Sequence, residues 1–232
     1  MKNKKLIIDI FKALIVFIVF FCSSFIKRLL CTIFDIKIKG MSTSTNLLLT
    51  FIVYVIIIAL FIILYGKEFK VEWKNFTSKL GKNLDTSLKY YGIGFLGMIF
   101  FNIIINFILK LGQSQNENAV QSLIKAAPFF MIVYAGILGP IVEELVFRKS
   151  LKNVFKNKWV FVIVSGILFG FVHIVGFELK TPLEFLYILP YGSLGAMFAY
   201  MDYEVDSTFP SITMHMLHNT VLVILSVVLK IL

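Results

Sequence analysis

Long apolar runs recur along the chain and alternate with short polar connections from one end to the other. A transmembrane helix needs about 20 mostly apolar residues, and this criterion predicts seven spans. Their approximate ranges are 6–26, 47–65, 88–109, 128–148, 159–178, 183–201 and 209–229. The pattern therefore predicts an all-α fold, a polytopic membrane helical bundle of about seven (six to eight) transmembrane helices, in a single membrane domain over residues 1–232.

The stretch between the second and third spans has a different pattern. Residues 67–88 alternate charged side chains with apolar ones, among them Phe69, Trp73 and Phe76. Such alternation is typical of an amphipathic helix at the membrane interface, and a solvated loop is the alternative. We therefore expect residues 1–109 to form accessory transmembrane helices with an interfacial amphipathic segment at 67–88.

The composition agrees with a multi-pass protein of a cell membrane. Hydrophobic residues make up 59% of the chain, and its mean hydropathy is +0.89, above the range of soluble domains. The basic start followed by an apolar run resembles a signal peptide, but Phe20 and Phe21 stand before Cys22, where cleavage needs small residues. The first span is thus expected to stay as an anchor. The small size and the many lysines and isoleucines favour a bacterial plasma membrane.

The formal net charge of +10 comes from basic residues that lie between the apolar runs. No basic, aromatic-rich recognition module surrounds them, so they indicate membrane topology and lipid-headgroup contacts and not nucleic-acid binding. The connections on the same side of the membrane as the amino terminus hold more lysine and arginine than those on the other side. This favours a cytoplasmic amino terminus. Cys22 and Cys31 have no CxxC or metal-type spacing, so no disulfide framework or zinc cluster is expected.

Small residues mark positions where helices can approach closely. Gly166 and Gly170 have GxxxG spacing in the fifth span, and Gly192 and Gly195 follow in the sixth. Small residues at such spacing let two helix backbones come together. We therefore expect close helix packing at these glycines.

Two adjacent carboxylates and an arginine stand out in the fourth span, where an ionised side chain needs a partner or water. They are Glu143, Glu144 and Arg148. Residues four apart share a helical face, so Glu144 is placed to pair with Arg148, while Glu143 points about 100° away. Glu143 then needs another cation, a water or a proton. The structural alternative is that Glu143 completes a buried ion-pair network with Arg148.

The three histidines of the chain, His173, His215 and His218, all fall in later apolar spans. If the fourth and fifth spans form a hairpin that turns near residues 157–158, Glu143 and His173 each lie about 15 residues, or ~22 Å, from the turn. That depth requires the basic end of the fourth span to project beyond the hydrocarbon. The spacing thus predicts a carboxylate beside an imidazole.

The seventh span adds an amide to this set. Pro210 suits the first turn of a helix, which places His215 and Asn219 four apart on one face. His218 shares that face only in part and is interpreted as packing. Glu143 as a general base on water, with an imidazole and an amide to stabilise an oxyanion, supplies the parts needed for peptide hydrolysis.

Other catalytic chemistries have less support. No GxSxG motif is present, and neither cysteine lies near a histidine in the sequence, so covalent catalysis is not indicated. The zinc-protease motif HExxH is also missing. Glu143, His173 and His215 could still ligate zinc, so a metal site stays an alternative at this point.

Three motifs, in order, resemble those of the CPBP family of intramembrane proteases, also called CAAX protease and bacteriocin-processing or Abi proteins. The family pattern is EExxxR, FxxxH and HxxxN in successive transmembrane helices. The chain carries Glu143-Glu144-Leu-Val-Phe-Arg148, Phe169-Gly-Phe-Val-His173 and His215-Met-Leu-His-Asn219. The resemblance covers residues 128–229, which we expect to form the catalytic core.

The resemblance implies a glutamic-type, metal-independent intramembrane endopeptidase without a cofactor. It implies that Glu143 activates water, that His173 assists, and that His215 and Asn219 form the oxyanion site. The residues it implies as supports for these groups are Glu144, Arg148 and Phe169.

Three function classes follow from these residues. The first is an endopeptidase that acts on a membrane-associated peptide or protein; bacterial members of the family are linked to peptide maturation and bacteriocin immunity. The second is a non-catalytic membrane protein that binds a peptide, as an immunity protein does. The third is a proton-coupled transporter, since intramembrane Glu and His also form proton relays, although the chain has no internal repeat. The substrate and the oligomeric state stay open.

Overall fold

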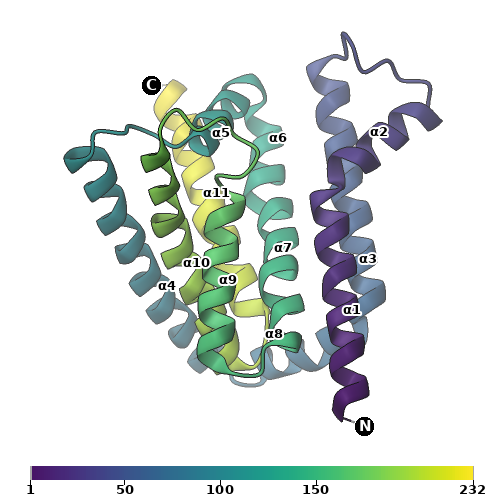
Figure 1. The fold of residues 1–232 in the computed structure, drawn as a ribbon, viewed down its shortest axis with the longest axis vertical. Helices are drawn as coiled ribbons and strands as arrows, with labels where there is room; N and C mark the ends of the chain where they lie inside the picture. Colours follow the sequence, from purple (N-terminus) through teal and green to yellow (C-terminus); the bar gives the residue numbers. More distant parts are fainter. Residues whose placement is uncertain (1, 232) are drawn as a thin grey trace.

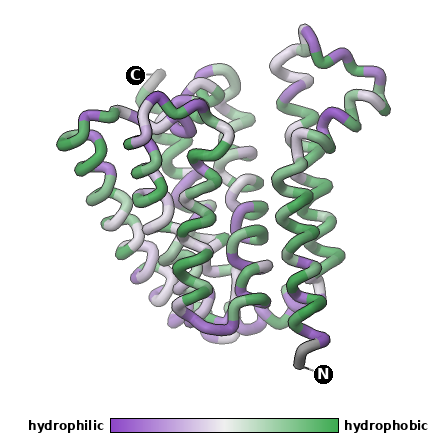
Figure 2. Tube along the Cα trace, viewed as in Figure 1, coloured by the Kyte–Doolittle hydropathy of each residue, from purple (hydrophilic) through white to green (hydrophobic). Residues whose placement is uncertain are grey.

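The computed structural model describes residues 2–231, and within this range the chain is helical and contains no β-strand. The predicted all-α fold is therefore confirmed. Figure 1 shows the helices side by side in a bundle, with the two ends of the chain on opposite sides. In Figure 2, hydrophobic residues dominate the helices and hydrophilic ones gather toward the connections, as expected for a multi-pass membrane protein.

The amino-terminal half contains four helices. Their bounds are α1 Lys2–Phe21, α2 Ser23–Ile33, α3 Thr43–Ser78 and α4 Leu80–Ile103, which continues as the π-helical turn η1 Ile104–Ile108. The chain bends by 62° between α1 and α2. Ser42 caps the start of α3, because its hydroxyl oxygen accepts a hydrogen bond from the Thr45 N–H at 3.1 Å.

The carboxyl-terminal half is built around a composite helix over residues 128–154. Its segments are α6 Pro128–Val133, η2 Tyr134–Leu138, α7 Gly139–Glu144, η3 Leu145–Ser150 and α8 Leu151–Val154, of which η2 and η3 are π-helical. The short helix α5 Gln115–Ala126 precedes it. The helices that follow it are α9 Lys158–Val172, the 3-10 helix η4 Pro182–Tyr187, α10 Ile188–Val205 and α11 Phe209–Ile231.

The predicted hairpin between the fourth and fifth spans turns where it was expected. α8 ends at Val154 and α9 begins at Lys158. Asn157 caps α9, because its side-chain oxygen accepts hydrogen bonds from the N–H groups of Trp159 and Val160 at 3.0 and 3.1 Å. The hairpin places α9 alongside the composite helix.

Within the described residues, four helices are long and apolar enough to cross a membrane, or five if α1 and α2 form one bent span. The four are α3, α4 with η1, the composite helix and α11. This count is smaller than the seven spans expected, because α9 has only 15 residues and α10 includes polar ones. α10 packs between α4, α9 and α11, so it needs less apolar surface than a helix surrounded by lipid, whereas α9 keeps an exposed apolar face and is only too short.

The expected interfacial segment at 67–88 is not one separate helix. Residues 67–78 form the last turns of α3, residues 80–88 form the first turns of α4, and the two helices meet at Lys79. The Asn83 amide donates hydrogen bonds to the carbonyl oxygens of Asn75 and Phe76 at 2.9 and 2.8 Å. These carbonyls lie in the last turn of α3, where no helical N–H reaches them. That the segment lies at the membrane interface stays a prediction.

α9 and α10 approach closely at the glycines where the sequence predicted tight helix packing, although the sequence did not indicate which helices pair. A Cβ atom on Gly166 would lie 2.9 Å from the Gly192 carbonyl oxygen, and one on Gly170 would lie 2.5 Å from that of Ile188. A real side chain cannot fit at either distance, so these backbones meet only because the residues are glycines. The contact brings the end of α9, with His173, next to the start of α10.

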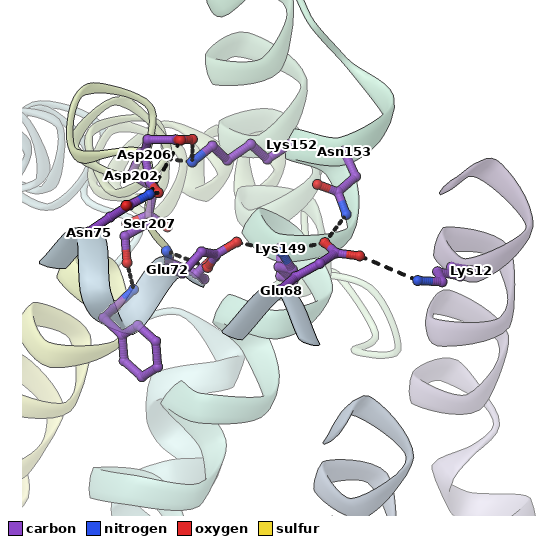
Figure 3. Close-up of polar contacts among 12 residues, drawn as sticks. Lys12, Glu68, Glu72, Asn75, Lys149, Lys152, Asn153, Asp202, Asp206 and Ser207 are labelled. Atoms are coloured by element: carbon purple, nitrogen blue, oxygen red, sulfur yellow. Dashed lines mark hydrogen bonds and ion pairs between the residues drawn. The ribbon is translucent and has the colours of Figure 1, made fainter. Parts of the chain in front are cut away.

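A buried ionic network joins the amino-terminal helices to the composite helix (Figure 3). Lys149, whose side chain is 1% exposed, pairs with Glu68 of α3 at 2.7 Å and also with Glu72 of α3. Glu68 in turn pairs with Lys12 of α1 at 3.4 Å. Arg148 and Lys149 are therefore buried between helices. That this end of the composite helix projects past the hydrocarbon stays a prediction.

Candidate active site

The composite helix is irregular on both sides of the paired glutamates, where η2 and η3 widen it. Pro140 has no N–H and so leaves carbonyl groups one turn earlier without a backbone donor. Side chains of α11 supply the donors instead: the Asn219 amide binds the Ala135 oxygen at 3.0 Å, and the Thr220 hydroxyl binds that of Gly136 at 3.1 Å. These bonds fix the glutamates relative to α11, and π-helical turns of this kind are frequent at functional sites.

Glu144 is sealed in the bundle and has two partners. One of its oxygens lies 3.0 Å from the Arg148 Nε, and both side chains are 0% exposed, so the predicted pair is present. The other oxygen lies 2.7 Å from the His215 Nδ1, a partner that the helical spacing did not indicate. The Arg148 guanidinium also donates to the Gly195 carbonyl at 3.2 Å and lies 4.3 Å above the Phe169 ring. Glu144 thus orients His215 as well as Arg148.

Glu143 faces the other way, and its side chain is 22% exposed. Its Oε2 lies 3.9 Å from the His215 Nε2, which is too long for a direct hydrogen bond. Among the described residues Glu143 forms no ion pair with Arg148, so the alternative of one shared ion-pair network does not describe this geometry. His215 therefore lies between two carboxylates, bound to Glu144 and close to Glu143.

The sequence placed His173 inside the predicted span 159–178. In the structure it is the residue at which α9 ends. Its Nδ1 is 2.7 Å from the carbonyl oxygen of Phe169. A carbonyl oxygen can only accept, so Nδ1 carries the hydrogen, and in the neutral ring Nε2 is an acceptor. The ring also stacks on Tyr191, with the centroids 4.3 Å apart and an angle of 17° between the planes.

A cavity of about 650 Å³ joins these groups. The four predicted catalytic residues line it, namely Glu143, His173, His215 and Asn219. Its wall also includes Tyr54 of α3, Asn102 of α4 and Asn106 of η1. The first hundred residues carry no motif, so the contribution of α3 to this cavity was not predicted.

Two further residues support α11 and the cavity. Asp202 is fully buried, and its carboxylate accepts hydrogen bonds from the N–H and the hydroxyl of Ser211 at 2.9 and 2.6 Å, one turn before His215. His218 also lines the cavity, and its Nδ1 lies 3.0 Å from the Tyr91 hydroxyl. Its contacts with aromatic rings agree with a packing role. Asp202 belongs to none of the three motifs, so its bonds to Ser211 were not predicted from the sequence.

The connections on the α5 side of the cavity are also held by hydrogen bonds. The Tyr187 hydroxyl donates to the Gly112 carbonyl oxygen at 2.6 Å. This bond fixes the loop before α5 against η4.

Among the described residues, no three His, Cys, Asp or Glu side chains are grouped so that they could hold a metal ion. The set considered from the sequence, Glu143, His173 and His215, is therefore not such a group. Whether the reaction depends on a metal is a separate question, and metal independence stays a prediction.

The fold and the site define a class: a helical membrane protein whose buried carboxylates and imidazoles meet at one cavity. Residues 125–221 match the family model described as "Type II CAAX prenyl endopeptidase Rce1-like". The resemblance that the three motifs indicated is therefore confirmed. The matched segment contains all seven residues of the motif set.

Bacterial membrane proteins are among the similar sequences. The chain is 32% identical over 116 residues to the Bacillus subtilis protein named "Putative membrane peptidase YdiL", which covers 49% of this chain and 43% of that protein. It is 34% identical over 76 residues to the UPF0177 protein YajF of Lactococcus lactis, covering 32% of this chain and 37% of that protein. The chain thus spans less than half the length of these two relatives. No solved structure matches it significantly.

Proposed function

We propose that the protein is an intramembrane endopeptidase that hydrolyses a peptide bond in a membrane-associated peptide or protein. One observation carries this proposal: Glu143 opens into a cavity of about 650 Å³ beside His215, while the adjacent Glu144 is sealed against Arg148. Two neighbouring carboxylates in such different surroundings suit different tasks. The match of residues 125–221 to the Rce1-like family model supports the same reaction class.

In this mechanism Glu143 is the general base. It accepts a proton from a water molecule in the cavity, and the resulting hydroxide attacks the carbonyl carbon of the scissile bond. His173 holds the same water through its Nε2, which is an acceptor because Nδ1–H donates to the Phe169 carbonyl. A water held by two acceptors has one lone pair directed at the substrate.

His215 and Asn219 stabilise the oxyanion that forms. The His215 Nδ1 is bound to Glu144, and its Nε2 lies on the Glu143 side of the ring, where a hydrogen on Nε2 can be donated to the oxyanion. The Asn219 amide has two N–H donors, one of which binds Ala135 at 3.0 Å, so the second serves the substrate. The C–N bond then breaks, and protonated Glu143 returns its proton to the leaving amine.

The reaction proposed here is metal-independent, and its substrate is a bacterial membrane-associated peptide or protein. The family description names a prenyl endopeptidase, but the chain matches that family only over residues 125–221. We do not extend the prenylated substrate to this protein. Roles in bacteriocin immunity or in the processing of a secreted peptide both fit a cavity within the bundle.

Comparative peptidomics tests this proposal. Membranes and medium from cells with the wild-type protein are compared with those from cells with Glu143→Gln, and peptides that require Glu143 should disappear. Glu204→Gln is the matched control, because this carboxylate pairs with Lys158 away from the cavity. Identical peptide sets for wild type and Glu143→Gln, with both proteins folded, contradict the proposal. If Glu143→Gln also retains the cellular phenotype, the non-catalytic binding function takes its place.

Metal dependence is tested separately with the purified protein. Treatment with a chelator, followed by removal of the chelator, is expected to leave unchanged the cleavage of any peptide that the peptidomics experiment identifies. Loss of cleavage that returns on addition of zinc contradicts the metal-independent mechanism and leaves the peptidase proposal intact.

A further inference from the structure

His173 needs support from outside its own helix. It is the residue at which α9 ends, and the segment that follows it up to η4 has no regular helix. Its backbone is therefore less constrained than that of His215, which lies inside α11, in its first half. Three contacts hold the imidazole: the Phe169 carbonyl at Nδ1, the Phe169 ring at 4.6 Å between centroids, and the ring of Tyr191.

Tyr191 is itself anchored at its hydroxyl. The Tyr191 oxygen lies 2.9 Å from the Ser114 hydroxyl and accepts a hydrogen bond from the Asn116 amide at 3.3 Å. Ser114 is also the N-cap of α5, because its oxygen accepts from the Glu117 N–H at 3.1 Å. One hydroxyl group therefore fixes both the start of α5 and the Tyr191 ring.

α5 is a wall of the cavity in which Glu143 lies. Ser114, Asn116 and Glu117 line that cavity together with His173 and Tyr191. The contacts form a continuous path from the α5 cap, through the tyrosine hydroxyl and the stacked ring, to the imidazole. None of the three sequence motifs includes a residue of this path other than His173.

We propose that Tyr191 is a positioning residue that holds the His173 imidazole in the orientation and tautomer used in the reaction, and that it links this orientation to α5. The importance of this for catalysis rests on the proposed function, whereas the linkage itself does not. The parallel ring contact prevents rotation of the imidazole, so Nδ1–H stays on the Phe169 carbonyl and Nε2 faces the cavity. A shift of α5 on substrate entry would reach His173 by the same path.

The test uses the full chain in detergent micelles with isotope-labelled histidine and no substrate. Only three histidines are present, so NMR of the ring nitrogens resolves the tautomer of each, and single His→Gln variants assign them. In the wild type, His173 is expected in the Nδ1–H tautomer alone. Removal of an aromatic ring changes nearby chemical shifts in any case, so the tautomer, and not the shift, is the decisive reading.

Tyr191→Leu removes the stacked ring and is expected to give a mixture of the two His173 tautomers. Tyr191→Phe and the double variant Ser114→Ala/Asn116→Ala keep the ring but release its anchor, so both should give the same smaller change. Tyr90→Leu is the control, because Tyr90 packs on Tyr200 and does not line the cavity. It should leave His173 unchanged.

A wild-type tautomer for His173 in Tyr191→Leu overturns the proposal. If Tyr191→Leu does not fold, a wild-type tautomer in both anchor variants overturns it instead, since these leave the packed ring in place. The outcome is independent of the peptidase proposal: His173 can respond as expected in a protein whose Glu143→Gln variant keeps its cleavage products. That result would refute the proposed reaction but not the positioning of His173.

Discussion

Lys149 offers a direct measure of how strongly the amino-terminal helices are joined to the composite helix. Its side chain is 1% exposed and is bound by Glu68 at 2.7 Å and by Glu72 (Figure 3). Lys149→Met removes the cation and leaves the Glu72 carboxylate, 10% exposed, with the Thr208 N–H at 2.9 Å as its remaining donor. Breaking a buried pair from one side costs about 3–5 kcal/mol. We expect a loss of stability of that size.

Unfolding of the purified protein in mixed micelles by increasing denaturing detergent measures this loss. Lys12→Met is the matched control, because the Lys12–Glu68 pair is longer, 3.4 Å, and both of its side chains are partly exposed. Such pairs contribute about 0–1 kcal/mol. The double variant Lys149→Met/Glu72→Gln keeps an acceptor for Thr208 and should recover most of the stability. Equal losses for Lys149→Met and Lys12→Met would refute the reasoning.

Two other predictions follow from close contacts in the bundle. Gly170→Ala should lower the free energy of unfolding by about 1–3 kcal/mol, because its Cβ would lie 2.5 Å from a backbone oxygen. Gly92→Ala has open space around it and should be neutral or slightly stabilising in the same unfolding assay. Equal effects of the two variants contradict close α9–α10 packing. Glu144→Gln leaves Arg148 buried without its counter-charge and should lower the free energy of unfolding by about 3–5 kcal/mol. Glu143→Gln should change the free energy of unfolding by less than about 1 kcal/mol. Similar losses of stability in the two variants contradict the separate roles of the two carboxylates.

The fold class and the helix pairings near the motifs could be predicted because they depend on local spacing. Apolar runs predicted a helical membrane bundle, and the spacing of Glu144 and Arg148 predicted their ion pair. The number of independent spans could not be predicted as well. α9 is apolar but short, and α10 is partly polar and covered by neighbours, and composition alone does not show which helices face lipid.

The sequence indicated candidate residues for the site, but not the contacts between them. Helical spacing separated Glu143 from Glu144, yet the bond from Glu144 to His215 joins positions 71 residues apart, and only the folded chain brings them together. Asn219 was expected to form the oxyanion site with His215. Its bond to Ala135 exists because Pro140 removes a backbone donor on another helix, a relation that no spacing within α11 could indicate.

The central claim is that Glu143 is the general base of a peptidase. The most direct measurement is the rate at which purified protein in liposomes cleaves a peptide identified by the peptidomics above, for wild type and Glu143→Gln at equal folded amounts. Because general bases contribute about 10²–10⁴-fold, Glu143→Gln is expected to lower the rate by at least about 100-fold. A Glu143→Gln rate equal to that of the wild type would contradict the claim.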